Sequence, residues 1–170
     1  MKGRFIHVIR GELFYSYGHT IFYNQYIMKT VSDLLCFFMS FTVVLVVLTF
    51  LLRVPHIITQ QPAIVDEYYL KGFTQNVPLD YFFVFVYFLI AMFFIETFRV
   101  TSENMKIVIM AVSTVLITSA FCFYFQSYPV SKAFFSRWFH KAGYNASVYD
   151  MFLLVFTYLL YRYLQNKVAK

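Results

Sequence analysis

The sequence predicts an all-α integral membrane protein with four transmembrane helices and a short amphipathic interfacial helix. The first observation is composition: 61% of the residues are hydrophobic, 13% are charged, and the mean hydropathy is +0.65. A soluble domain of ordinary composition carries about 25% charged residues. The second observation is that the apolar residues gather in long runs, and a helix needs about 20 such residues to cross a bilayer. Together they favour a helical bundle in lipid.

Four apolar runs are predicted to be the spans. The first and third carry no charged residue. The fourth carries Asp150 and Arg162, whose charged groups must reach opposite head-group layers. The alternative for this run is an interfacial helix or a helix buried against a partner protein. The four runs are 34–52, 79–98, 107–125 and 148–164.

The chain divides into a basic, aromatic N-terminal arm over 1–33 and a four-span membrane domain over 34–170. Four spans place both ends of the domain on the same side of the membrane. Lys and Arg residues close to the spans number six on the side of the N-terminus and five on the opposite side. Since cytoplasmic loops carry the excess of Lys and Arg, we expect the N-terminus to be cytoplasmic.

A short segment between the third and fourth runs has the pattern of an interfacial helix over 131–142. Aromatic side chains fall on one face of this helix and cationic side chains on the other, as in helices that lie at the bilayer surface. Ser131 is predicted to cap its start and Gly143 to end it. The alternative is a helix that packs on protein. The residues predicted to contact the membrane interface are Phe134, Phe135, Trp138 and Phe139, with Lys132, Arg137 and Lys141.

Small residues recur every fourth position in the first and third runs, which lets neighbouring helix backbones approach closely. The predicted helix-packing residues are Cys36, Ser40, Thr114, Thr118 and Cys122.

The carboxylates lie near the ends of the runs, where an acidic side chain can reach the head groups. Asp80 and Glu96 are therefore expected to be interfacial anchors, and Asp33 and Asp150 also lie within a turn or two of the end of a run. Glu96 is expected to pair with Arg99 at i, i+3 on the same helix. Carriers usually place ionisable groups near the bilayer midplane, so this placement favours passive spans.

No motif in the sequence indicates catalysis. The four histidines are scattered outside the runs, and the sequence has no glycine-rich phosphate loop. We therefore expect no enzymatic activity, no cofactor, no metal and no nucleic-acid partner, and we identify no soluble small-molecule substrate.

The function expected from these features is that of a structural or accessory subunit of a larger membrane complex. The expected partners are membrane lipids and other membrane subunits, because the aromatic surface exceeds what four helices can cover. Respiratory, translocation and viral-envelope complexes fit equally well. The alternative is a small ion channel or a proton-coupled carrier.

Overall fold

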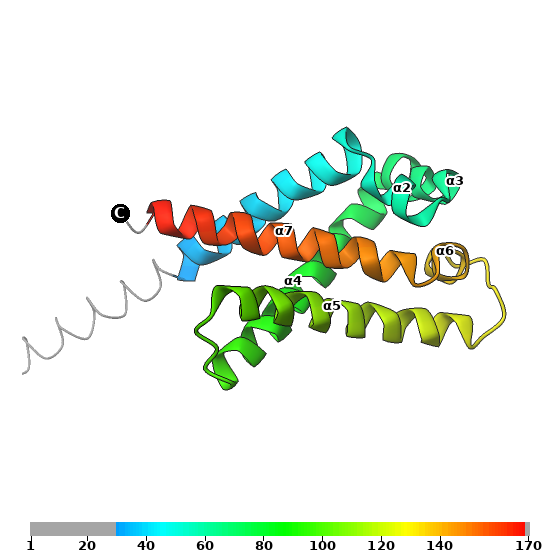
Figure 1. The fold of residues 1–170 in the computed structure, drawn as a ribbon. Helices are drawn as coiled ribbons and strands as arrows, with labels where there is room; N and C mark the ends of the chain where they lie inside the picture. Colours follow the sequence, from blue (N-terminus) through cyan, green and yellow to red (C-terminus); the bar gives the residue numbers. More distant parts are fainter. Residues whose placement is uncertain (1–29, 169–170) are drawn as a thin grey trace, which may run out of the picture. The chain divides into compact units, whose positions relative to one another are not determined.

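A computed structural model describes residues 30–168, and all the secondary structure in this part of the chain is helical (Figure 1). Most of the N-terminal arm predicted over 1–33 lies outside the described residues. The chain separates into two compact units, Met1–Cys36 and Phe37–Lys170. Residues 30–36 of the first unit are helical. The arrangement described below is that of the second unit.

Three helices are long and apolar enough to cross a membrane: Thr30–Leu51, α4 (Phe73–Thr97) and α5 (Glu103–Gln126). They contain the first three predicted runs, so the prediction of an all-α protein with membrane-spanning helices is confirmed to this extent. The helix over the fourth run, α7 (Asn145–Val168), has 24 residues but is not among the three. Its charged and polar residues lower its average hydropathy, and a fourth span stays a prediction.

α4 begins earlier than the sequence indicates. The run was predicted to start at residue 79, whereas the helix starts at Phe73 and contains Pro78. A proline removes one intrahelical hydrogen bond, and membrane helices tolerate this loss because other groups satisfy the freed backbone. Asp80 consequently lies about 10 Å along the helix from Phe73, at 1.5 Å per residue. It does not lie at the edge of the helix.

The segment that joins the first helix to α4 is a series of short helices at one end of the bundle. The first helix ends in a π-helical segment, η1 (Val46–Leu51), which is followed by α2 (Val54–Thr59), α3 (Pro62–Asp66) and the π-helical η2 (Glu67–Lys71). Pro55 and Pro62 lie in the first turns of α2 and α3, where their missing N–H groups cost nothing. This segment places Tyr68 and Tyr69 in the protein interior.

α5 and α7 lie side by side and antiparallel (Figure 1). The Thr118 hydroxyl donates to Asp150 at 3.0 Å, and Arg162 contacts Glu103 at 3.2 Å near the other end of the pair. Because these contacts lie far apart along both helices, they fix the alignment of α7 on α5.

The first helix is antiparallel to α4. The hydroxyls of Thr42 and Tyr81 are 2.7 Å apart, and Phe37, five residues earlier, contacts Phe88. The first helix also contacts α7, because Thr49 and Tyr149 share a hydrogen bond of 2.7 Å. Three helices of the bundle thus meet near the end where η2 lies.

The segment over 131–142 contains the helix α6 (Phe134–Ala142), which ends at Gly143 with a positive φ of 58°, and an interfacial position for it stays a prediction. Ser131 lies before the helix rather than at its cap, which is Ala133. The aromatic face of α6 packs on protein: Trp138 and Phe139 are only 7% and 8% exposed. Protein therefore covers these two side chains, and the contact of this face with acyl chains stays a prediction. An amphipathic pattern indicates that one face of a helix contacts an apolar partner. It does not distinguish lipid from protein.

Candidate functional site

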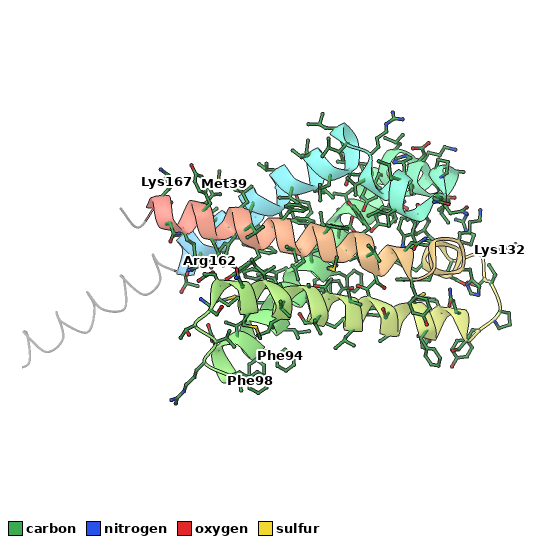
Figure 2. All side chains as sticks on the ribbon, viewed as in Figure 1. Met39, Phe94, Phe98, Lys132, Arg162 and Lys167 are labelled. Atoms are coloured by element: carbon green, nitrogen blue, oxygen red, sulfur yellow. The ribbon has the colours of Figure 1, made fainter. Side chains whose placement is uncertain are left out.

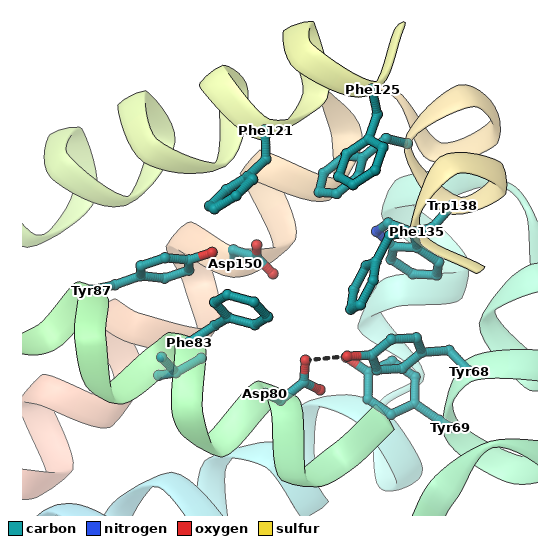
Figure 3. Close-up of a pocket in the computed structure, with 12 residues that line it drawn as sticks. Tyr68, Tyr69, Asp80, Phe83, Tyr87, Phe121, Phe125, Phe135, Trp138 and Asp150 are labelled. Carbon is teal, nitrogen blue, oxygen red and sulfur yellow. Dashed lines mark hydrogen bonds between the residues drawn. The ribbon is translucent and has the colours of Figure 1, made fainter. Parts of the chain in front are cut away.

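A cavity of about 130 Å³ lies at the end of the bundle where η2, α4, α5, α6 and α7 meet (Figure 3). Aromatic rings form most of its wall, and two carboxylates on different helices complete it. Its lining residues are Tyr68, Tyr69, Asp80, Phe83, Val84, Tyr87, Phe121, Phe125, Phe135, Trp138, Phe139 and Asp150.

Asp80 enters the cavity from α4. Its Oδ1 atom accepts a hydrogen bond of 2.5 Å from the Tyr68 hydroxyl, which is drawn in Figure 3. Its Oδ2 atom is buried and has no hydrogen-bond partner among the described residues. Burial, followed by the negative charge of Asp80, raises the pKa of Tyr68 well above its ordinary value. Tyr68 therefore stays protonated and acts as a donor to the carboxylate.

Asp150 enters the same cavity from α7. Its Oδ2 atom accepts the hydrogen bond from Thr118 on α5, a residue that lies about 12 Å before the end of that helix at 1.5 Å per residue. Figure 3 shows the Asp150 and Asp80 carboxylates facing the same aromatic-lined space. Asp150 itself lies about 7.5 Å after the start of α7 at Asn145, at 1.5 Å per residue.

No Lys, Arg or His of the described chain lines this cavity. A carboxylate in apolar surroundings is costly unless a positive charge or a proton neutralises it. Within residues 30–168, the hydrogen bonds to Asp80 and Asp150 come from the hydroxyl groups of Tyr68 and Thr118. A bound cation or protons would consequently stabilise the two carboxyl groups of the cavity.

Buried hydroxyl groups position the tyrosines beside Asp80. Tyr69 lies 3.4 Å from Tyr149, oxygen to oxygen, and Tyr149 shares the hydrogen bond with Thr49. These three residues come from η2, α7 and the first helix. The contacts hold η2, and with it Tyr68, against the bundle.

An ion pair fastens α6 over the cavity. Arg137 on α6 makes two hydrogen bonds to the Glu67 carboxylate on η2, one of them 2.9 Å long from Nη1 to Oε2. The hydrogen bond from Arg137 holds the pKa of Glu67 below its ordinary value. The pair therefore contributes stability above the ordinary pKa of a glutamate, and this contribution is lost as the pH falls through the lowered pKa.

Most of the residues predicted from sequence fall into three groups. Phe135, Trp138 and Phe139 line the cavity, and Arg137 forms the ion pair with Glu67. All five predicted packing residues are buried, and Thr118 also binds Asp150. The predicted pair between Glu96 and Arg99 is not among the ion pairs of the described chain, because the helix ends at Thr97 and Arg99 has a left-handed backbone with φ of 49°.

Sequence reasoning missed the site itself, since it treated Asp80 and Asp150 as separate anchors. A signal was present: successive spans alternate in direction, so the starts of the second and fourth runs lie on the same side of the membrane. Asp80 and Asp150 both lie near these starts. Within the described residues, no group of three or more His, Cys, Asp and Glu side chains could hold a metal ion.

The sequence matches no protein-family model, and no curated protein or solved structure is significantly similar to it.

Proposed function

We propose that this chain is a four-span membrane protein that binds a cation in the carboxylate cavity and carries it across the membrane. The observation behind the proposal is that Asp80 and Asp150, on two different helices, line one cavity without a basic partner. Ionisable residues inside membrane helices are rare because they are costly, and they mark pathways for ions or protons. The geometry thus favours the carrier alternative over a passive span.

The alignment of α7 with α5 supports the fourth span. Ser147 hydrogen-bonds Ser119 at 3.2 Å, and Arg162 contacts Glu103 at 3.2 Å. The part of α7 between these two contacts covers about 22 Å at 1.5 Å per residue, beside a helix that is apolar enough to span. If α5 crosses the bilayer, α7 must cross most of it too.

A four-span topology with a cytoplasmic N-terminus makes a labelling prediction. Cysteines introduced singly at Ser102 and Asn166 should react with an impermeant thiol reagent from the cytoplasmic side only. A cysteine at Lys132 should react only from the opposite side. All three positions are exposed, so a failure to react reports the membrane barrier. Labelling of positions 166 and 132 from the same side would contradict the fourth span, and reversal of all three would contradict the orientation.

A second prediction concerns the transport of cations by the purified protein. The purified protein in liposomes should move protons or Na⁺ down an imposed gradient faster than protein-free liposomes do, measured with enclosed fluorescent indicators. Asp80→Asn should abolish this flux because it removes one of the two negative charges of the cavity.

The matched control is Glu96→Gln, which removes a carboxylate from the exposed far end of the same helix. It should leave the flux unchanged. The carrier proposal fails if the wild-type protein moves no cation, or if the double variant Asp80→Asn, Asp150→Asn moves cations at the wild-type rate.

The accessory-subunit hypothesis rests on the outer surface of the helices. Exposed apolar side chains there include Met39, Phe94 and Phe98 (Figure 2). Lipid covers such side chains as well as a partner subunit does, so they give this hypothesis no separate support. Stable subunits that co-purify in mild detergent would favour it.

A further inference from the structure

We infer that the preferred occupant of the cavity is an alkylammonium group that carries at least one N–H bond. The inference rests on the proposed function, since it names the class of cation that the carboxylate cavity binds. Three features of the site define this class: the chemistry of the wall, the volume of the cavity and the unpartnered oxygen of Asp80.

The wall presents aromatic rings from four elements around the two carboxylates. They include Phe83 from α4, Phe125 from α5 and Trp138 from α6. The ring faces attract cations, and most strongly those that have shed their water, such as alkylated ammonium groups. Inorganic cations keep their hydration more firmly and gain less from such a wall. The aromatic lining therefore favours an organic cation.

The volume fits a small alkylated group. The cavity measures about 130 Å³. An engineered cavity of about 150 Å³ in another protein takes up benzene. A trimethylammonium group is of similar size, so it can enter with its methyl groups against the rings. A fully hydrated metal ion is larger and finds few oxygen ligands here, whereas Ca²⁺ takes six to eight and Mg²⁺ six.

The Oδ2 atom of Asp80 sets the requirement for an N–H bond. It is buried and has no hydrogen-bond partner in the described chain, while Oδ1 already accepts from Tyr68. A buried acceptor without a donor is costly, and a donor from a charged group forms the strongest bond with it. An ammonium N–H would supply this bond. Tetramethylammonium has no N–H and would leave Oδ2 unpaired.

The sole tryptophan of the chain, Trp138, lines the cavity, so its fluorescence reports on this site alone. The test titrates the full-length protein, in a maltoside detergent without added lipid, with trimethylammonium chloride at pH 7. We expect a saturable change in Trp138 emission. The half-saturating concentration of tetramethylammonium should be about tenfold higher than that of trimethylammonium, because tetramethylammonium cannot form the charge-assisted hydrogen bond. The uncharged tert-butanol should give no saturable change.

Two variants and a control locate the binding. Asp80→Asn should weaken trimethylammonium binding by about tenfold or more, because it removes the charge that pairs with the N–H. Phe125→Leu should weaken binding by removing an aromatic ring from the wall while keeping an apolar side chain. Glu96→Gln should bind like the wild-type protein. Because the comparison of the three probes uses only the wild-type protein, a variant that fails to fold does not remove the test.

The ammonium group could come from a soluble amine or from the head group of phosphatidylethanolamine. Repeating the titration in phosphatidylglycerol vesicles, with and without phosphatidylethanolamine, separates these sources. A lipid head group in the cavity would compete and raise the half-saturating concentration of trimethylammonium. If the natural occupant is a soluble amine, the half-saturating concentration of trimethylammonium should be the same with and without phosphatidylethanolamine.

Equal responses to trimethylammonium and tert-butanol would overturn the inference, as would wild-type affinity in the double variant Asp80→Asn, Asp150→Asn. Proton or Na⁺ flux in liposomes without any trimethylammonium binding would overturn the inference and leave the proposed function standing. Saturable trimethylammonium binding without flux of any cation would support the inference and overturn the carrier function.

Discussion

Replacing Asp150 with Asn should stabilise the cation-free protein while it removes cation flux. The amide oxygen of Asn can still accept the hydrogen bond from Thr118, and the substitution removes a negative charge from an aromatic cavity. We expect the free energy of unfolding to rise by about 1 to 3 kcal/mol, because Asp150 is held in the interior without a cationic partner among the residues that line the cavity. Unfolding by a denaturing detergent, followed by Trp138 emission at neutral pH, measures this difference.

The stabilisation by Asp150→Asn should shrink at acidic pH, because protonation of Asp150 removes the same charge from the wild-type protein. Glu96→Gln, at an exposed position, should change the free energy of unfolding little at either pH. A less stable Asp150→Asn variant at neutral pH would mean that the carboxylate has a structural role in the cation-free bundle. Such an outcome would count against a site held ready for a cation.

Phe139→Ala should lower the free energy of unfolding by about 3 to 5 kcal/mol, the usual cost of truncating a buried Phe. The Phe139 ring stacks on Phe125 at 5.3 Å between centroids, with 7° between the planes. The backbone oxygen of Phe139 also accepts a hydrogen bond of 3.1 Å from Gln126. Loss of the ring should loosen α6 and expose Trp138 to water, which shifts its emission to longer wavelength.

The control for Phe139→Ala is Phe123→Ala on α5, because Phe123 is 67% exposed and lies two residues before Phe125. Phe123→Ala should lower the free energy of unfolding by less than about 1 kcal/mol, as surface substitutions usually do. Similar decreases in the free energy of unfolding for the two variants would mean that α6 does not pack on α5 as described. In that case the cavity would lack the wall that α6 supplies.

Sequence reasoning could identify the three apolar helices because their signal is local. A run such as 107–125 carries its own evidence in its length and its lack of charge. The start of α4 could not be identified in the same way, because Pro78 resembles a helix boundary while the neighbouring structure tolerates it. The local sequence pattern therefore identifies the three spans but places the start of α4 too late in the chain.

The candidate site could not be identified locally because it depends on pairs of distant residues. Asp80 and Asp150 are ordinary edge carboxylates until α4, α5 and α7 pack and place them in one cavity. The amphipathic pattern of 131–142 likewise gave the helix and its apolar face, but only the packed structure identifies Phe125 and Tyr68 as the partners of that face. Thr118 was predicted for its small size, while its hydroxyl also binds Asp150.

The alignment of α7 on α5 also bears on how the chain enters a membrane during synthesis. Asp and Arg each cost about 2.5 to 3.5 kcal/mol at the centre of an inserting helix, and less towards its ends. α7 carries Asp150 and Arg162, and the groups that bind them, Thr118 and Glu103, both belong to α5. Because the ribosome makes α5 first, Thr118 and Glu103 are already available to bind α7 when it leaves the ribosome. If α7 is the fourth span, as proposed, the two helices are suited to enter as a hairpin, and a chain without α5 would leave α7 outside the bilayer.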